Sequence, residues 1–318
     1  MRRSACAIIW IGLVLALPID AWAVPFGVSD ILSNFNAVVQ GNFSTSSDVA
    51  GPVAIGGNIS GTGTFFNQGL PMGSAFSRFG SVNVYGNASN ASYNANMIVV
   101  DVGGTGSNAT FSGASAVRYG VSYPISFASL WAPLTALSTG MSTLSPTSAA
   151  ALPAAGANNA VLSATAATVK GYGKVGVIDI SASLLQSYTG VSVALNGADT
   201  VIINVTGNFT GNPNFQNGSA YRSNVIWNFV DATSINLGSY GIEGTVLAPY
   251  ATVTNSNPIE GTLVAAAYVG TGEIHYYPFS GQAAFLNSFA TPIPEADGLV
   301  VLSIGVATLA WRRRQTRA

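Results

Sequence analysis

Short runs of β-branched and aromatic residues recur along most of this chain, and each run ends at glycine, asparagine or serine. Examples are residues 53–55, 82–85, 97–102, 175–180 and 200–205. Glycine and asparagine tolerate the left-handed backbone conformations of tight turns, so they separate strands. Many short strands in regular succession predict a mainly β protein that is built as a sandwich, a barrel or a β-solenoid.

A near-repeat in the C-terminal third favours the solenoid. The segment IEGTVLA at residues 242–248 recurs as IEGTLVA at residues 259–265. This spacing is close to one coil of a β-helix, in which each coil stacks equivalent side chains over those of the previous coil. The repeat places Val246 under Leu263 and Leu247 near Val264, with Gly244 and Gly261 at one corner. A hairpin in a β-sandwich could give the same similarity, so the sandwich remains the alternative.

One segment, residues 124–145, has a helical pattern instead. Its large apolar residues are spaced by three or four, as on one face of an amphipathic helix. They are Phe127, Leu130, Trp131, Leu134, Leu137, Met141 and Leu144. Pro124 suits the first turn, while Pro133 and Gly140 predict a kink or two shorter helices. We expect this helix to pack lengthwise on the β body. The Ala-rich residues 147–168 are expected to form a weakly structured surface connection.

Both ends of the chain resemble targeting signals. Arg2 and Arg3 precede an apolar stretch at residues 5–17, and Ala21 and Ala23 suit a signal peptidase that cleaves after Ala23. The sequence therefore predicts a signal peptide at 1–23, a β domain at 24–287 and a short linker at 288–293. The remaining segment, 294–318, contains an apolar run at 298–311. This run would form a helix of about 21 Å, whereas a bilayer core is about 30 Å thick.

In the segment 294–318, Pro294, Glu295 and Ala296 precede the apolar run, and Arg312, Arg313 and Arg314 follow it. This arrangement resembles the PEP-CTERM sorting signal. The resemblance implies export, transient anchoring in the inner membrane through 298–311, processing by an exosortase-type enzyme, and delivery to the cell surface or extracellular matrix. Ala296 departs from the family, in which a second proline is usual. An ordinary single-span anchor is the alternative, and it also implies a surface location.

Charge and cysteine content exclude several classes of function. Between the two end segments, five Lys and Arg residues and nine Asp and Glu residues give a net charge of minus four. So few cations make nucleic acid an unsuitable partner. Cys6, in the predicted signal peptide, is the sole cysteine of the chain. The predicted mature domain therefore has no disulfides, and packing and backbone hydrogen bonds must stabilise it.

Five stretches of the body lie at residues 35–43, 48–58, 224–229, 244–249 and 272–279. In this order, they resemble the matching stretches of the choice-of-anchor A family. Residues 40–42 and 50–52 depart from the family by lacking charged residues. The resemblance implies an adhesive or structural surface module without established catalytic residues. A β-solenoid flanked by a helix is also similar to the layout of bacterial ice-binding proteins.

Candidate catalytic and ligand-binding residues are few. His275 is the single histidine, and on a strand it would share a face with Glu273, so a hydrolase would have to combine these two residues with a serine. The sequence assigns no catalytic, cofactor-binding or metal-ligating residue, although a calcium site assembled from distant Asp residues stays open. The segment 102–108 is expected to be a flexible turn. Five aromatic residues could either stack on sugars or belong to the core. They are Trp227, Tyr250, Tyr268, Tyr276 and Tyr277.

Three functions remain open. The first is a non-enzymatic exported protein, an adhesin or structural component that binds exopolysaccharide through a broad face rich in Ser, Thr and Asn. The second is binding to ice or another crystalline surface, which stacked threonines such as Thr245 and Thr262 would support. The third is a carbohydrate-active enzyme, which needs two carboxylates about 5 to 10 Å apart in a cleft. Eight Asn-x-Ser/Thr triplets are expected by chance in so Asn- and Ser-rich a chain. Their asparagines are Asn42, Asn58, Asn87, Asn90, Asn108, Asn204, Asn208 and Asn217.

Overall fold

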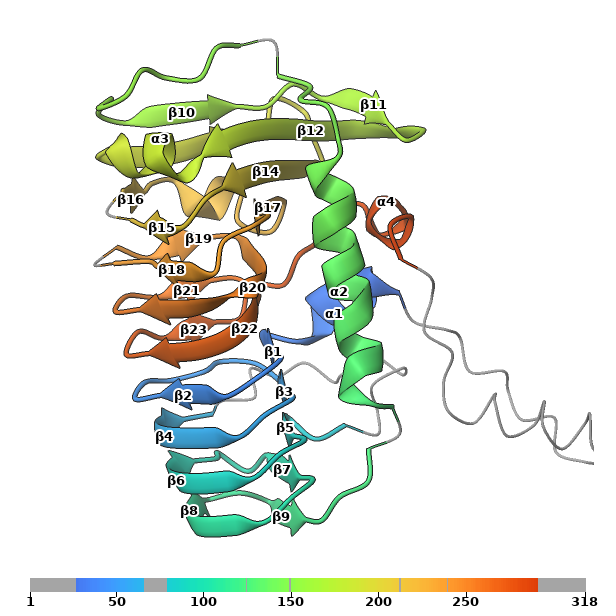
Figure 1. Ribbon diagram of the computed structural model, residues 1–318, viewed down its shortest axis with the longest axis vertical. Coiled ribbons are helices and arrows are strands. Elements are labelled where there is room, and N and C mark those ends of the chain that lie inside the picture. Colours follow the sequence, from blue (N-terminus) through green and yellow to red (C-terminus); the bar gives the residue numbers. More distant parts are fainter. Residues whose placement is uncertain are drawn as a thin grey trace, which may run out of the picture.

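The computed structural model describes residues 27–65, 79–123, 125–148, 150–211, 213–238 and 240–290. It is mainly β, with one large, predominantly parallel sheet and few helices (Figure 1). Among the pairings that these residues form, all are parallel except one between β11 (Ala167–Val169) and β12 (Tyr172–Ser181). A β-sandwich is built from antiparallel sheets, so the predominance of parallel pairing does not support the sandwich alternative.

The large sheet contains two ladders of stacked strands. Ladder 1 consists of β15 (Phe209–Thr210), β18 (Ser234–Asn236), β20 (Thr245–Asn255), β22 (Leu263–Gly270), β2 (Phe43–Thr45), β4 (Ile59–Thr64), β6 (Ala88–Asn94) and β8 (Gly106–Ser112). Ladder 2 consists of β12, β14 (Thr200–Thr206), β17 (Val225–Phe229), β20, β22, β1 (Ala37–Val39), β3 (Val53–Ile55), β5 (Val82–Val84), β7 (Val99–Val102) and β9 (Ala116–Tyr119). The long strands β20 and β22 contribute to both ladders.

Two small parallel sheets complete the β body. One contains β19 (Ile242–Glu243), β21 (Ile259–Glu260) and β23 (Ile274–His275). The other contains β10 (Ala160–Ser163), β13 (Gly190–Ala194) and β16 (Asn214–Phe215). Strand β10 lies within residues 147–168 and β11 begins there, so the expectation of a weakly structured connection was wrong from residue 160 onward. The segment 102–108 was also wrongly expected to be a turn throughout, because β8 begins at Gly106.

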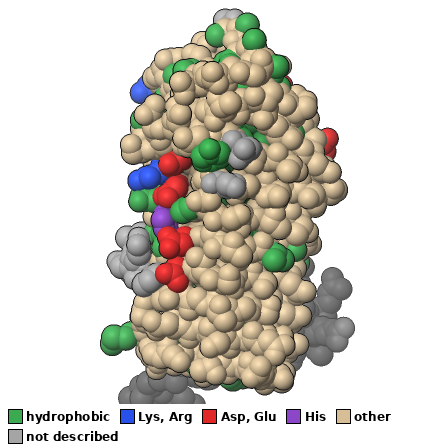
Figure 2. All heavy atoms as spheres, turned by 90° about the vertical axis from the view of Figure 1, so that its left-hand side faces the viewer, with side chains coloured by type: hydrophobic (Ala, Val, Ile, Leu, Met, Phe, Trp, Pro, Cys, Tyr) green, Lys and Arg blue, Asp and Glu red, His purple; other side chains and the backbone are tan. Residues whose placement is uncertain are grey.

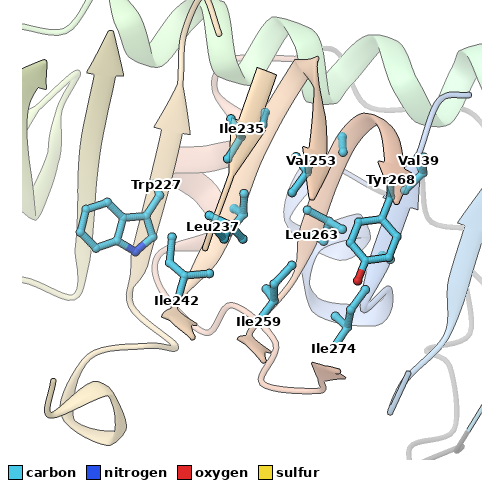
Figure 3. Packing of buried hydrophobic residues seen from close by; sticks show 14 of the residues in the cluster. Val39, Trp227, Ile235, Leu237, Ile242, Val253, Ile259, Leu263, Tyr268 and Ile274 are labelled. Carbon is cyan, nitrogen blue, oxygen red and sulfur yellow. The ribbon is translucent and has the colours of Figure 1, made fainter. Parts of the chain in front are cut away.

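The core lies between the ladders and the sheet of β19, β21 and β23. Ile242, Ile259 and Ile274 are in register and point into the space that Val253 and Leu263 also fill (Figure 3). All five side chains are fully buried. Burial of one such aliphatic side chain contributes about 1.5–3 kcal/mol, so repeated Val, Ile and Leu positions stabilise each added coil.

The near-repeat predicted the local stacking correctly. Val246 pairs with Leu263 and Leu247 with Val264. Gly244 has a φ of 118°, and a Cβ on Gly261 would lie 2.3 Å from the carbonyl oxygen of Gly244. One glycine is therefore required for its positive φ and the other for the close approach of two backbones.

Helix α2 (Phe127–Ser142) runs along the outer side of ladder 2 (Figure 1). Its 16 residues span about 24 Å, which is about five strand spacings. Leu130, Leu134, Leu137 and Met141 are fully buried against ladder 2, as their spacing predicted. The short helices α1 (Val28–Asn34) and α4 (Ala283–Asn287) belong to the same apolar layer.

The predicted boundaries of α2, and the alternative of two shorter helices, differ from the structure. The helix begins after Ser126, whose hydroxyl accepts a hydrogen bond from the Ser129 N–H at 3.2 Å, and Pro124 lies outside the described residues. It remains a single helix although Pro133 lies inside it. Two further short helices, α3 (Ala182–Ser187) and a 3-10 turn (Gly218–Ala220), lie in the upper part of the body. None of the described helices is both long enough and apolar enough to cross a membrane.

Candidate functional site

The outward side of ladder 1 is a broad surface without charge. Its eight strands contain no Asp, Glu, Lys, Arg or His. Inward residues such as Tyr93 and Val253 are buried, while their neighbours Ser92, Thr252 and Thr254 point outward, as alternation along a strand requires. In Figure 2, most of this side is occupied by atoms of neither charged nor hydrophobic side chains. We call this surface the hydroxyl face.

Outward side chains of the hydroxyl face are aligned across strands. One column crosses six strands in continuous register, and it consists of Thr210, Asn236, Thr254, Val269, Ser44 and Ser60. Two shorter columns cross three strands, and they consist of Thr62, Ser92 and Thr110, and of Thr64, Asn94 and Ser112. Neighbouring strands are about 4.8 Å apart, so hydroxyl and amide groups repeat at this interval along each column, except at Val269 on β22.

Asparagines hold the corner between the two ladders. The side-chain oxygen of Asn42 accepts a hydrogen bond from the Asn58 N–H at 3.0 Å. Asn58 accepts in the same way from Asn87 at 2.8 Å, and Asn87 from Thr105 at 2.8 Å. Asn208 accepts from the Thr233 N–H at 2.9 Å in the upper part of the body. Each asparagine thus fixes the coil that stacks against it and orients the hydroxyl-face strand that begins there.

The corner explains a sequence pattern that the sequence analysis missed. At each of four corners, the chain has the order Gly, Asn, an inward-pointing residue, and an outward-pointing Ser or Thr. These segments are Gly41–Ser44, Gly57–Ser60, Gly86–Ser89 and Gly207–Thr210. Four of the eight Asn-x-Ser/Thr triplets therefore arise from the architecture, and the expectation that they occur by chance was wrong for these four. Spacing of the Gly-Asn pairs would have revealed the coils.

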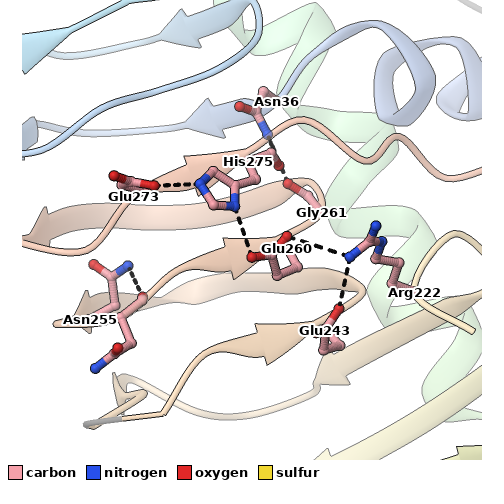
Figure 4. A network of polar contacts seen from close by, with 9 residues as sticks. Asn36, Arg222, Glu243, Asn255, Glu260, Gly261, Glu273 and His275 are labelled. Atoms are coloured by element: carbon pink, nitrogen blue, oxygen red, sulfur yellow. Dashed lines mark hydrogen bonds and ion pairs between the residues drawn. The ribbon is translucent and has the colours of Figure 1, made fainter. Parts of the chain in front are cut away.

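Charged side chains gather in a row on the sheet of β19, β21 and β23, at the margin of the hydroxyl face (Figure 2). Glu243, Glu260 and His275 are paired in register. Arg222 Nη1 lies 3.6 Å from Glu243 Oε2 and 3.7 Å from Glu260 Oε2. His275 Nδ1 lies 2.8 Å from Glu260 Oε1, and its Nε2 contacts Glu273 (Figure 4). We call these five residues the charged row.

Electrostatics of the charged row follow from burial and from close pairing. Burial raises the pKa of the Glu243 carboxyl, and the neighbouring Glu260 raises it further, while Arg222 acts in the opposite direction. Burial lowers the pKa of His275, but the hydrogen bonds to Glu260 and Glu273 outweigh it and hold this pKa above its usual value. The row therefore favours a positively charged imidazole.

This geometry does not suit a serine hydrolase. The prediction that Glu273 and His275 lie on one side is consistent with their contact. However, carboxylates occupy both ring nitrogens of His275, so neither nitrogen is free to accept a proton from a serine. A cavity of about 350 Å³ at the C-terminal end of α2 does not match a glycoside hydrolase site either. Its lining includes one carboxylate, that of Asp179, where glycoside hydrolysis needs two.

The remaining candidate residues have varied positions. Trp227, Tyr268 and Tyr276 are buried in the core, whereas the Tyr250 side chain is 47% exposed. Tyr277 lies under Arg222, whose guanidinium carbon is 3.3 Å from the ring centroid. Thr245 and Thr262 are stacked but fully buried, so they cannot contact a crystalline surface as the sequence suggested.

Metal ligands and sorting residues complete the candidate set. Within the described ranges, no three His, Cys, Asp or Glu residues come together as a metal site. The predicted signal and sorting residues lie outside the described residues. They are Ala21, Ala23, Pro294, Glu295, Ala296, Arg312, Arg313 and Arg314.

Comparisons with known proteins show to which family this chain belongs. No curated protein matches the sequence. Among solved structures, an ice-binding protein from the Antarctic ascomycete Antarctomyces psychrotrophicus is similar, with 15% identity and a TM-score of 0.39, over 81% of this chain and 100% of that chain. The model of the family described as "Putative Ice-binding-like adhesive domain" matches residues 28–276. This match spans most of the sequence, so the chain belongs to the ice-binding-like adhesive domain family.

Proposed function

We propose that this protein is a non-enzymatic adhesin or structural component that binds exopolysaccharide, or another extended surface polymer, through the hydroxyl face. Membership of an adhesive-domain family supports a place at the cell surface or outside the cell. The observation that carries the proposal is the register that aligns uncharged side chains across the strands of ladder 1, all of them polar in the six-strand column except Val269.

The chemistry of the face suits a polyhydroxylated polymer. Serine, threonine and asparagine side chains both donate and accept hydrogen bonds, as sugar hydroxyls do. Each such contact contributes little, because both partners are well hydrated before they bind. A polymer that runs along the columns can form many of these contacts at once, and many copies on one surface add avidity. A flat face of this kind needs no deep pocket.

The proposed architecture is a β-solenoid of stacked coils in the manner of the choice-of-anchor A family. Its support is the parallel register of ladder 1 and ladder 2, together with the Asn-containing corners between them. We take residues 24–287 as one domain, after a signal peptide at 1–23 and before a linker at 288–293 and a PEP-CTERM-like signal at 294–318. Under this proposal, export machinery and an exosortase-type enzyme are partners, and 298–311 contacts the inner membrane only transiently.

Retention on purified exopolysaccharide tests the proposal. Purified domain is passed over the immobilised polymer at low salt and at physiological salt. An uncharged face predicts retention at both, because contacts between neutral groups are only weakly screened by ions. Passage without delay at low salt would contradict adhesion to this polymer. Mass spectrometry of the native surface protein would test maturation separately, since it reports whether cleavage follows Ala23 and whether the segment after Pro294 is removed.

Binding to ice or to another crystalline surface is a second candidate, and specific residues favour it. Strand β4 presents Thr62 and Thr64 outward, and strand β20 presents Thr252 and Thr254. Two threonines on one strand form a small regular array, although serine, alanine and valine interrupt this array on neighbouring strands. Thermal hysteresis of the purified domain would support this candidate, and freezing behaviour equal to that of a buffer control would dismiss it.

A further inference from the structure

Two distant parts of the chain meet at a seam across the middle of the β body. Strand β22 from the C-terminal part stacks on β1 and β2 from the N-terminal part (Figure 1). Strand β23 continues this seam on the third side. The Ile274 N–H donates to the Asp48 carbonyl at 2.9 Å, and the Ala50 N–H donates to the Ile274 carbonyl at 2.8 Å. His275, the next residue, therefore lies at the seam itself.

The side chain of Asn36 reinforces the same place. Its Nδ2 donates to the carbonyl oxygens of Gly261 at 2.8 Å and of His275 at 3.0 Å (Figure 4). Its Oδ1 accepts from the Gly51 N–H at 3.0 Å. One side chain from the N-terminal part thus joins two C-terminal coils. The position of His275 is coupled to the closure of the seam through these backbone contacts.

Both nitrogens of the His275 ring face carboxylates. Nδ1 lies 2.8 Å from Glu260 Oε1 on β21, and Nε2 contacts Glu273, which precedes β23. An ionised carboxylate only accepts hydrogen bonds, so both ring nitrogens must donate. A neutral imidazole has one N–H, whereas the imidazolium has two. The arrangement is therefore complete only when His275 carries a proton on each nitrogen.

The positive charge that the proton gives His275 offsets repulsion among the surrounding glutamates. Glu243 and Glu260 are directly opposite each other on adjacent strands, which is unfavourable for two like charges. Arg222 lies near both, and His275 is the second cation of the row. Asp48 belongs to the N-terminal coil that faces β23. Loss of the His275 proton would leave Arg222 as the single cation among these three glutamates. One of the two carboxylates that contact His275, on Glu260 or Glu273, would then lose its hydrogen-bond donor.

We propose that His275 is a pH-dependent latch at the seam. In its protonated form it clamps β23 to β21 and holds Ile274 against the N-terminal coil. When His275 loses a proton, one of its two hydrogen bonds to Glu260 and Glu273 is lost, and these carboxylates repel each other. The seam then loosens locally around Ile274, while ladder 1 and ladder 2 stay paired.

The direction of the pH effect follows from the charged row. The pKa of His275 is raised in the folded protein, so its stabilisation is fully present below the ordinary histidine pKa of about 6.5 and is lost as pH rises through the raised value. The pKa of Glu243 is also raised, and its contribution is likewise lost as pH rises, but in a lower pH range. Both groups therefore make the protein more stable in mild acid than in mild alkali.

A titration by NMR tests the protonation state. Because the chain contains one histidine, a single pair of imidazole signals reports on His275 without assignment by mutation. We expect its midpoint above about 6.5, the value for an unperturbed histidine. Glu273→Gln should lower this midpoint, because it removes one negative charge from a half-exposed position and leaves the core intact. A midpoint at or below the unperturbed value in the wild-type protein would overturn the proposal.

Hydrogen exchange tests the latch itself. Protection factors, which correct for the intrinsic pH dependence of exchange, should fall for the Ile274 and Ala50 amides as pH rises through the His275 midpoint. The Leu263 amide, which donates to the Asn36 carbonyl at 2.9 Å in the same seam, should stay protected. His275→Gln should abolish the pH dependence at Ile274 and Ala50. Constant protection of these amides across the wild-type titration would overturn the latch even if His275 is charged.

A matched control separates the latch from general charge effects. Lys174 Nζ and Asp199 Oδ2 form an exposed pair at 3.7 Å on the upper coils. Exposed pairs of this kind contribute little, so Asp199→Asn should leave the His275 midpoint and the Ile274 protection unchanged. An equal effect of Asp199→Asn and Glu273→Gln would show that overall charge, and not the clamp, controls the seam, which would overturn the proposal.

Discussion

At the scale of single residues, the corner asparagines have the clearest structural role. Asn58 is an acceptor for one neighbouring coil, and its own N–H is a donor to the other. An exposed hydrogen bond contributes about 0.5–1.5 kcal/mol, and water can replace part of it. The significance of these asparagines lies in their repetition, because each one sets where the next hydroxyl-face strand begins.

Asn58→Ala should therefore lower the free energy of unfolding by about 0.5–1.5 kcal/mol in urea titrations, because the Asn87 N–H loses its acceptor. Asn158→Ala is a suitable control. Asn158 is exposed and accepts from the Thr189 hydroxyl, which can turn to water instead. We expect a change within about 0.5 kcal/mol for this control. Equal effects of the two substitutions would contradict a special role for the corner.

At three of the four corners, the glycine before the asparagine is required by the close approach of coils, whereas Gly207 at the fourth corner has a positive φ of 93°. A Cβ on Gly57 would lie 2.5 Å from the backbone carbonyl carbon of Gly41. Gly57→Ala should destabilise the protein by about 1–3 kcal/mol, as overpacking does, and lower the thermal midpoint. Gly173→Ala is the control, since a Cβ there meets no atom within 4 Å. A thermal midpoint that Gly57→Ala leaves unchanged would show that the coils can separate easily at this corner.

Helix α2 shows, at the scale of whole elements, how a chain can stack out of sequence order. Strands β1 to β9 descend along the lower half of the body, α2 returns the chain along ladder 2, and β12 to β22 descend again until they reach β1 (Figure 1). The helix also covers the apolar outer side of ladder 2. Its buried residues make that side unavailable to a partner and leave the hydroxyl face as the broad open side.

Leu134→Ala should be costly because this side chain is fully buried between α2 and ladder 2. Large-to-small substitutions in a core lower the free energy of unfolding by about 2–5 kcal/mol. Thr139→Ala on the exposed side of the same helix should change it by less than about 0.5 kcal/mol. Chemical denaturation measures both. A small effect of Leu134→Ala would mean that α2 is only loosely attached to the ladder.

Sequence patterns predicted local features better than long-range ones. The spacing of Leu130, Leu134 and Met141 predicted the buried side of α2, and the near-repeat predicted the pairing of Val246 with Leu263. The stacking of β22 on β1 could not be predicted, because these strands come from opposite parts of the chain and share no repeat. The corner pattern was available in the sequence but has only two fixed residues, Gly and Asn, in a chain rich in both.

Candidate site residues were harder to predict for a physical reason. A hydroxyl face consists of ordinary Ser, Thr and Asn residues, which become distinctive only when register aligns them. Thr245 and Thr262 illustrate the difficulty. The residues that follow them, Val246 and Leu263, pair as the repeat predicted, yet both threonines are fully buried. Position relative to the core, and not residue type, decides which threonines are available to a ligand.

On the scale of the whole molecule, the three sides of the β body differ in the side chains they present and in what covers them. Ladder 2 is covered by α2, the charged row lies on the sheet of β19, β21 and β23, and ladder 1 presents the hydroxyl face. The strands of ladder 1 contain no charged residue, so the charged side chains of the described residues lie off the strands of the proposed binding surface. This separation lets the face bind neutral polymers while charge elsewhere supports solubility.

The most direct test of this account compares polymer binding by three forms of the domain. Thr252→Arg combined with Ser92→Arg places two large cations on the hydroxyl face, and Ala132→Arg places one on the exposed side of α2. For a neutral exopolysaccharide, we predict that the double variant loses at least about tenfold in affinity, equivalent to about 1.4 kcal/mol, while Ala132→Arg binds like the wild type. Equal binding by all three forms would contradict the central claim that the hydroxyl face is the binding surface.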